Sequence, residues 1–242
     1  MKLSSFVYEE LTKQDGIGPL ERATYVVLDE LLPSTKTRLA SLVGVRLDTL
    51  SRACSTLESL GWLALAPGRG NSLRPIPMVP HASQEQMAKI LELCYSLAGN
   101  KGEFLMKSFL DLRVKNRIYV DNARPDFLKN PKTGENLEYD RLYICKDAFE
   151  YDGDQHQRLT EKYPDESALR DLQARDAIKK GLSQDAGVRL ITVGTDALMP
   201  DLLDALIPAD IERRPLDTEG PLYNTLVRLC SIHIASARRK TR

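Results

Sequence analysis

The chain has 242 residues, with 34 Lys and Arg against 34 Asp and Glu, four Cys and 42% hydrophobic residues. This length suits one large domain or two small ones, and the composition excludes a disordered or collagen-like chain. No run approaches the roughly 18 apolar residues of a membrane helix, so we expect no membrane partner. The first residues turn acidic before an apolar core forms, and no two cysteines have CxxC spacing. We therefore expect no secretory signal, no zinc site built on paired cysteines, and a cytoplasmic chain with reduced thiols.

The first third of the chain predicts three helices and a hairpin. Residues 19–32 repeat apolar groups at helical spacing, beginning at a proline and followed by another. Further helices are expected at 36–43 and 47–61, with Gly44 in the turn between them. Residues 62–80 then change to strand, glycine-rich turn and strand. This is the element order of a winged helix-turn-helix.

The stretch TRLASLVGVRLDTLSRACSTLESLGWLAL, about 30 residues, closely resembles that family. The match includes the Leu-Ala pair, the turn glycine, the Ser/Thr-rich third helix and the Leu-Gly-Trp exit. Residues 36–74 hold six basic side chains against two acidic ones, a net charge of +4 where a recognition helix and wing would meet phosphate. We expect double-stranded DNA to contact Lys36, Arg38, Arg46, Thr49, Ser51, Arg52, Arg69 and Arg74, with Arg69 at the wing tip. A winged helix used for protein contact, with solvated arginines, is the alternative.

A linker is expected at 76–84, which carries prolines and little periodicity, with His81 solvated within it. The predicted domains are therefore 1–80 and 84–242. In the second domain we expect helices at 83–100 and 101–112, strands at 117–120, 124–128, 137–144 and 147–153, a helix at 165–185, a strand at 188–193, a helix at 195–207, and a last helix from Pro221. This order predicts an α/β fold with a mixed sheet flanked by helices.

Carboxylates gather near the ends of two neighbouring predicted strands. Glu138 and Asp140 stand on one strand, and Glu150 and Asp152 on the next. Residues i and i+2 of a strand face the same side, so each pair can point into one cleft. Such carboxylates repel one another unless a divalent cation neutralises them, and their hard oxygen ligands suit Mg²⁺ or Mn²⁺. A metal held in this way supports phosphodiester hydrolysis.

The same region, roughly residues 100–195, resembles the PD-(D/E)XK nuclease superfamily, which has a restriction-endonuclease-like core. The motif is an Asp, about ten residues of hairpin, and then Glu-x-Asp-Gly-x-Gln-His; the flanking RPDFLKNPKTGENLEYD and the later QARDAIKKG before GVRLITV fit the same branch. The resemblance implies that Asp140 and Glu150 bind the metal, that Glu103 from the first core helix joins them, and that the cofactor is Mg²⁺ or Mn²⁺. It implies no small-molecule cofactor.

The family's catalytic lysine should stand at position 152, where this sequence has Asp152. Gln155 or His156 then handles the proton, or a lysine reaches in from the long helix. On that helix one face carries Gln173, Asp176 and Lys180, and a neighbouring face carries Arg175 and Lys179. The candidate catalytic set is therefore Asp140, Glu150, Asp152, Gln155 and His156.

Other polar residues have less specific interpretations. Asp126 is a rival to Asp140 as the metal ligand, but the spacing of Asp140 to Glu150 suits adjacent strands of one hairpin better. Tyr139 and Tyr151 are expected to be packing residues, and His233 a packed or surface residue. The basic C-terminus either contacts phosphate or is a solvated helix end.

The leading hypothesis is a metal-dependent DNA endonuclease positioned by its winged helix, as in restriction, transposon or plasmid processing. One active site cuts one strand, so cutting both requires a homodimer or two successive events. The alternative, favoured by Asp152, is a transcriptional or replication regulator whose nuclease fold only binds or dimerises. An RNA-cutting enzyme also stays open, because the phosphodiester chemistry is shared.

Overall fold

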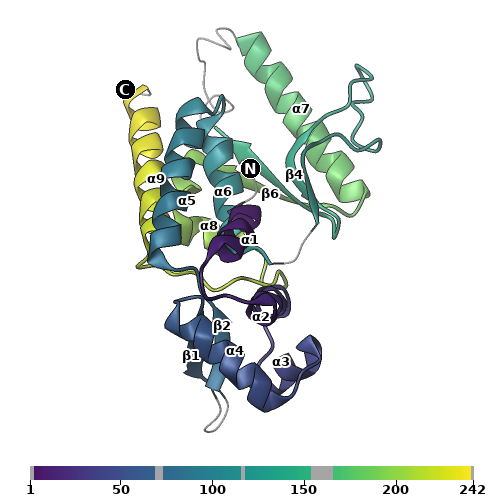
Figure 1. Ribbon diagram of the computed structural model, residues 1–242. Helices are drawn as coiled ribbons and strands as arrows, with labels where there is room; N and C mark the ends of the chain where they lie inside the picture. The colour runs from purple at the N-terminus through teal and green to yellow at the C-terminus, as the bar shows by residue number, and fades with distance from the viewer. Residues whose placement is uncertain (1–2, 69–72, 116–117, 154–165, 241–242) are drawn as a thin grey trace. The chain divides into compact units, whose positions relative to one another are not determined.

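The computed structural model describes residues 3–68, 73–115, 118–153 and 166–240 (Figure 1). Over these residues the chain is mixed α/β and divides into two compact units. The first unit comprises Met1–Ser96, Asp111–Asn116 and Glu212–Leu226, and the second comprises Leu97–Leu110, Arg117–Ile211 and Val227–Arg242. These units differ from the predicted domains, because residues that follow position 84 pack with the N-terminal part.

The first unit contains three helices and a hairpin at the predicted positions. Its elements are α1 (Leu3–Lys13), α2 (Pro19–Leu31), α3 (Lys36–Val43), α4 (Leu47–Ser59), the antiparallel strands β1 (Leu63–Pro67) and β2 (Leu73–Pro77), and α5 (His81–Leu97). The predicted bounds of α2, α3 and α4 are confirmed to within two residues, and the predicted order of strand, turn and strand after them is confirmed as well. Helix α1 was not predicted from the sequence.

Local chemistry sets the ends of these helices. Pro19 occupies the first turn of α2, and Leu32 ends that helix in the left-handed region with φ 40°. The Thr35 hydroxyl accepts the backbone N–H of Arg38 at 3.1 Å and so caps α3. Gly44 then ends α3 with φ 78°, a conformation that a residue with a Cβ rarely adopts.

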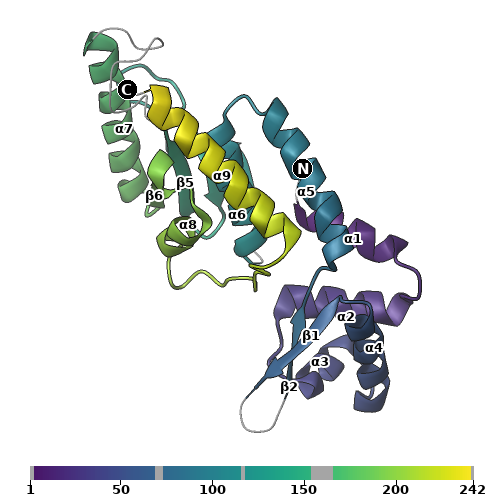
Figure 2. The same cartoon turned by 90° about the vertical axis from the view of Figure 1, so that its left-hand side faces the viewer.

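One apolar core holds the first unit together. Leu28, Leu39, Leu50 and Leu57 are fully buried in it, and Trp62 joins them from the start of the hairpin. Figure 2 shows α2, α3 and α4 gathered against β1 and β2. This core fixes the direction in which α4 presents its outer side chains.

The second unit is built around a four-stranded mixed sheet. Its elements are α6 (Lys101–Arg113, within this unit as far as Leu110), β3 (Tyr119–Ala123), β4 (Tyr139–Tyr143), β5 (Asp147–Asp152), α7 (Glu166–Asp185), β6 (Arg189–Gly194), a 3₁₀ turn (Thr195–Ala197), α8 (Pro200–Leu206) and α9 (Pro221–Lys240, within this unit from Val227). The strand order is β3-β4-β5-β6. The first two pairs are antiparallel, and β5 runs parallel to β6.

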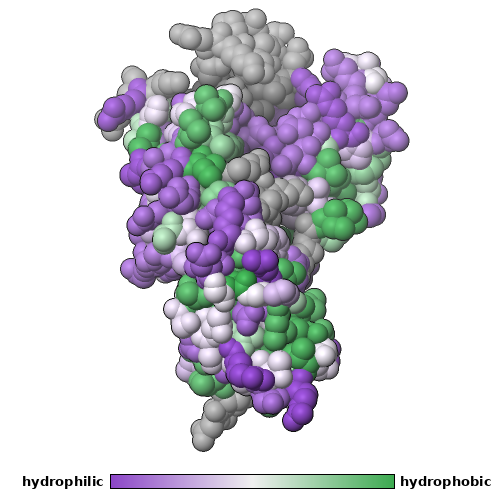
Figure 3. Space-filling model, viewed as in Figure 1, coloured by the Kyte–Doolittle hydropathy of each residue, from purple (hydrophilic) through white to green (hydrophobic). Residues whose placement is uncertain are grey.

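Helices cover both faces of this sheet (Figure 1). On one face, Ala148 of β5 packs in a core that includes Ile178 and Leu182 of α7. On the other face, the ring of Tyr151 lies against Gly102 of α6 and near His233 of α9. Hydrophilic side chains cover the described later part of α7 and the turn that precedes β4 (Figure 3). The central strand β5 is therefore enclosed, which is the setting in which a carboxylate becomes desolvated.

Three predicted elements were wrong. Residues 124–128 form a turn and not a strand, with the Leu128 N–H bonded to the Pro125 carbonyl at 2.9 Å, because Pro125 has no N–H for a ladder. The helix expected at 195–207 is broken into a 3₁₀ turn and α8, which begins at Pro200. The linker is shorter than predicted, because α5 already begins at His81, whose exposed ring lies 3.2 Å from an Asp217 oxygen.

The four cysteines form no disulfide. Among the helices that the structure describes, none combines the length and the apolar character needed to span a bilayer.

Candidate active site

Two adjacent strands bring Asp140 and Glu150 together. The ladder between β4 and β5 pairs Arg141 with Phe149 and Leu142 with Ala148. One residue beyond it, Asp140 Oδ2 accepts the backbone N–H of Tyr151 at 2.7 Å. The carboxylate of Asp140 is thereby fixed beside the part of β5 that carries Glu150, as the spacing of the two residues predicts.

Burial destabilises the charged form of both carboxylates. The pKa of Glu150 is raised to about 7, chiefly by burial; Lys179 opposes the rise, and the charge of Asp140 adds to it. Burial also raises the pKa of Asp140, as does the charge of Glu103, while the Tyr151 N–H lowers it. Among the described residues, Glu150 Oε2 is buried and has no hydrogen-bond partner. Two carboxyl groups of unlike surroundings therefore share one low-dielectric site.

A lysine reaches this site from α7. Lys179 Nζ forms an ion pair with Glu150 Oε1, and the Lys179 side chain is only 13% exposed. Ser183, one turn later, donates to the Lys179 carbonyl and bonds the Tyr139 hydroxyl, which fixes α7 against β4. The neighbouring Lys180 is exposed. The structure thus brings one residue from each predicted helix face, Lys179 and Asp176, near Glu150.

Glu103 lies near the same site but has its own partner. Its carboxylate forms an ion pair with Lys107, one turn further along α6. Lys107 also donates to Asn122 Oδ1 at 3.1 Å, and Asn122 donates to Glu138 Oε1 at 2.9 Å. Arg124 pairs with Glu138 from the other side at 2.6 Å. Glu138 is therefore held by structural contacts, and despite its partial burial these two hydrogen bonds lower its pKa.

Tyr151 links the site to the opposite face of the sheet. Its hydroxyl lies 2.9 Å from Thr195 Oγ1 and 3.0 Å from His233 Nε2. A Cβ added at Gly102 would overlap the Tyr151 ring, so only glycine lets α6 approach this closely. From the sequence, Tyr151 was expected to be a packing residue and His233 a packed or surface residue. Because Tyr151 and His233 are 82 positions apart, no local sequence pattern could predict their contact. The only available signal is Gly102, since a glycine within a helix indicates that another group packs closely against it.

The remaining candidate residues have varied positions. Asp152 is half-buried at the end of β5, and Asp126 is exposed in the turn after β3. The charge of Asp176 on α7 contributes to the raised pKa of Glu150. Gln155 and His156 lie outside the described residues.

The donor set suits a hard divalent cation held by few protein ligands. In the described part of the chain, no group of three or more His, Cys, Asp or Glu side chains is placed to hold a metal ion. Mg²⁺, however, is commonly bound by one or two carboxylates and completes its shell with water and substrate phosphate. Asp140 and Glu150 meet that requirement, and Glu150 Oε2 is a buried oxygen that lacks a partner among the described residues. Glu103 would have to leave Lys107 to become a third ligand.

The candidate DNA-contacting residues that the structure describes lie on α3, on α4 and just before it, and on β2 of the first unit. Arg46 directly precedes α4 and its side chain is 87% exposed, with Asp48 at 3.5 Å. The Ser51 hydroxyl donates to the Leu47 carbonyl at 2.8 Å. Exposed members are Arg38, Arg46, Arg52 and Arg74, half-buried members are Lys36, Thr49 and Ser51, and Arg69 lies outside the described residues. Three arginines near the start and middle of α3 and α4 are thus available to a polyanion.

The chain is similar to two viral proteins. It is 32% identical over 105 residues to "Uncharacterized protein 033L" of Invertebrate iridescent virus 3, a match that covers 43% of this chain and 53% of that protein. It is 38% identical over 112 residues to "Uncharacterized protein 307L" of Invertebrate iridescent virus 6, covering 40% of this chain and 57% of that protein. The chain therefore spans a little over half the length of these relatives. No family model and no solved structure matches it.

Proposed function

We propose that this chain is a metal-dependent endodeoxyribonuclease, with the site on β4, β5 and α7 as its active centre. The observation that carries the proposal is the pair of half-buried carboxylates, Asp140 and Glu150, with a lysine held against Glu150. Desolvated carboxylates with raised pKa values lower the stability of the fold in their charged form unless a cation binds them. A structural ion pair would not require a second half-buried carboxylate beside it.

The folds of the two units support this proposal. Three helices followed by a two-stranded hairpin, with exposed arginines on α3 and α4, fit a winged helix that holds duplex DNA. A mixed sheet flanked by helices on both faces fits the restriction-endonuclease-like core that the motif around Glu150 resembles. In that arrangement, the first unit would supply affinity and the second the chemistry.

Lys179 takes the role of the lysine that is missing at position 152. Its ammonium group contacts Glu150 Oε1 and is almost fully enclosed, so it can hold a proton or place positive charge on a phosphate oxygen. Asp140 and Glu150 would hold Mg²⁺ or Mn²⁺, which when bound polarises the phosphate and lowers the pKa of an attacking water. Tyr151 keeps Asp140 in place through its backbone N–H.

The rival function is a DNA-binding regulator with a non-catalytic core. It is favoured by Asp152 and by the ion pair that engages Glu103, which leaves two carboxylates where the family resemblance implies three metal ligands. In that case the first unit still binds duplex DNA. The two functions therefore differ in cleavage and not in binding.

A plasmid assay separates them. The full chain is incubated with supercoiled plasmid in Mg²⁺, Mn²⁺ or EDTA, beside Asp140→Asn and the control Glu135→Ala, which changes an exposed turn residue. We expect metal-dependent nicking by the wild type and the control, and none by Asp140→Asn. Intact plasmid in every metal, together with a retarded band on a duplex DNA gel, would support the regulator.

A further inference from the structure

A second lysine lies beside the carboxylate site, and it comes from α6. Lys107 forms an ion pair with Glu103, and the two side chains are only 14% and 19% exposed. Burial raises the pKa of Asp140 most, and the charge of Glu103 raises it further, so these two carboxylates lie close enough to repel each other. The Lys107 ammonium group therefore neutralises a carboxylate that would otherwise add to the negative charge around Asp140.

The backbone of Lys107 is fixed to β4. Arg141, which directly follows Asp140 on that strand, is buried and donates to the Lys107 carbonyl at 3.3 Å. Arg141 is in turn held by Asp121 of β3 at 2.7 Å. The start of the lysine side chain is thereby anchored near Asp140, while its flexible four-carbon stem still allows the ammonium group to move.

A second acceptor for this ammonium group lies on β3. Lys107 Nζ also donates to Asn122 Oδ1 at 3.1 Å. Asn122 lies between the two ladder pairs that flank Asp140, and its φ of 54° is in the left-handed region, which asparagine enters more readily than most residues. The Asn122 amide group donates to Glu138 Oε1 at 2.9 Å. An oxygen acceptor, with a carboxylate beyond it, is therefore available to Lys107 in the absence of Glu103.

This arrangement lowers the cost of separating Lys107 from Glu103. Breaking an enclosed ion pair is strongly unfavourable when one charge is left without a partner. Here the ammonium group has three donors, and it keeps the Asn122 oxygen when it leaves Glu103. The Glu103 carboxylate is then free to bind a divalent cation together with Asp140. The affinity of the site for a metal is therefore set by a competition between two cations for Glu103.

We propose that Lys107 is a positioning residue that acts as an internal counter-ion of the metal site. It engages Glu103 in the metal-free protein and exchanges that carboxylate for Asn122 and Glu138 when the site binds a divalent cation. This inference rests on the proposed function, because it concerns the same metal centre. Its consequence is a site that binds metal more weakly than three unpaired carboxylates would.

A double-mutant cycle on Mn²⁺ affinity tests the exchange. Titration calorimetry at pH 8 compares the full-length wild type with Lys107→Met, Glu103→Gln and the double variant. We expect Lys107→Met to tighten Mn²⁺ binding about tenfold, because Glu103 no longer has a competing partner. In the Glu103→Gln background the same change should alter the Kd by less than about twofold. The control Lys180→Met removes an exposed lysine from the same unit and should leave the Kd unchanged.

Two further variants separate this role from a purely structural one. Lys107→Arg keeps the charge and should bind Mn²⁺ as the wild type does. Asn122→Gly tolerates the positive φ but removes the acceptor that receives the displaced ammonium group, so it should weaken Mn²⁺ binding about fivefold. This second variant also decides the matter if Lys107→Met does not fold, since an unchanged Kd in Asn122→Gly would overturn the exchange.

The outcomes distinguish this inference from the proposed function. Equal tightening by Lys107→Met in the wild-type and Glu103→Gln backgrounds would mean that the lysine acts only through its charge, which would overturn the exchange and leave the metal site intact. If neither the wild type nor any variant bound Mn²⁺, the metal site and the proposed function would both be wrong.

Discussion

The backbone N–H of Tyr151 donates to Asp140 Oδ2 at 2.7 Å, directly beyond the paired part of the β4–β5 ladder. A backbone donor cannot rotate away as a side chain can, so the position of Asp140 is tied to that of β5 and hence to Glu150. The Tyr151 side chain in turn packs on Gly102 of α6 and bonds His233 of α9. Tyr151 is therefore the residue through which the surrounding helices set the geometry of the carboxylates.

Gly102→Ala should destabilise the protein, because the new methyl group overlaps the Tyr151 ring. Overpacking of this kind lowers the free energy of unfolding by about 1–3 kcal/mol, more than the gain in helix propensity. Chemical denaturation measures it. The matched control is Gly181→Ala on α7, where nothing lies within 4 Å, and which should raise stability by up to about 1 kcal/mol. Equal effects of the two changes would contradict the packing described for Tyr151.

Lys179→Met should lower the rate of plasmid cleavage by about 10²-fold or more, the usual range for removal of a proton-handling group. The exposed neighbour Lys180→Met is its control and should stay within about twofold of the wild type. Gel retardation by duplex DNA should be unchanged in both variants, because the change lies in the second unit. If Lys180→Met lost cleavage while Lys179→Met cleaved normally, then Lys180 and not Lys179 would act at the site, and the proposed role of Lys179 would be wrong.

Metal affinity should rise with pH. Because the pKa of Glu150 is about 7, its proton competes with the metal at pH 6 and is mostly absent at pH 8. The apparent Mn²⁺ affinity should increase about tenfold over this interval, as titration calorimetry would show. Glu150→Gln should bind Mn²⁺ more weakly and with less dependence on pH. An affinity for the wild type that is flat from pH 6 to 8 would mean that Glu150 does not bind the metal.

The stability of the metal-free protein should show the opposite trend. The folded protein holds the Glu150 proton more tightly than the unfolded chain, in which the pKa is near 4.5. The contribution of this group to stability is thus greatest at low pH, declines between about pH 4.5 and 7, and is lost above. Thermal unfolding with and without Mn²⁺ should show metal stabilisation that is larger at pH 8 than at pH 6. If Mn²⁺ raised the unfolding temperature equally at pH 6 and pH 8, Glu150 would not be a ligand of the metal.

Arg46→Ala and Arg52→Ala should each weaken duplex DNA binding by roughly the same factor on different sequences if they contact phosphate. The slope of log K against log salt should fall by about one for each arginine that no longer reaches a phosphate. Lys89→Ala, an exposed residue on α5 of the same unit, should leave both quantities unchanged. Unaltered binding in both arginine variants would favour a protein-contacting role for the first unit.

Sequence patterns predicted the elements well where the signals are local. Pro19 marks the start of a helix because its ring fixes φ, and Gly44 marks the end of one because it can adopt a positive φ. The spacing of Asp140 to Glu150 predicted that these two side chains lie close together. Tertiary packing decided the rest. Whether Lys179 or Lys180 reaches the site depends on how α7 is rotated about its axis against the sheet. The sequence of such a polar helix does not predict this rotation.

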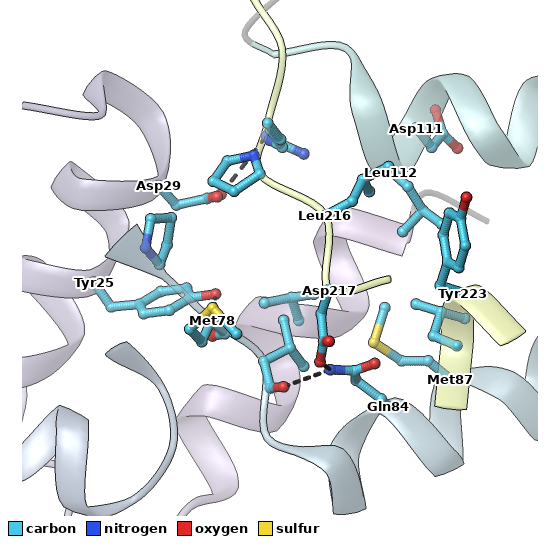
Figure 4. A pocket seen from close by; sticks show the side chains of 16 residues that line it. Tyr25, Asp29, Met78, Gln84, Met87, Asp111, Leu112, Leu216, Asp217 and Tyr223 are labelled. Atoms are coloured by element: carbon cyan, nitrogen blue, oxygen red, sulfur yellow. Dashed lines mark hydrogen bonds and ion pairs between the residues drawn. The ribbon is translucent and has the colours of Figure 1, made fainter. Parts of the chain in front are cut away.

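The same limit applies to other features of the fold. Residues 124–128 have the composition of a strand, but Pro125 prevents pairing and a turn forms instead. The contact of Tyr151 with His233 and the pocket beside Met87 in the first unit (Figure 4) join segments that only the folded chain brings together.

The most direct measurement is the rate at which the wild type and Glu150→Ala nick supercoiled plasmid in Mg²⁺, Mn²⁺ and EDTA, with both proteins purified in parallel. We predict nicking that requires the metal and is lost in Glu150→Ala, while both proteins still retard duplex DNA. Equal nicking by the two proteins would contradict the proposed active site, because the cleavage would then come from another site or from a contaminant.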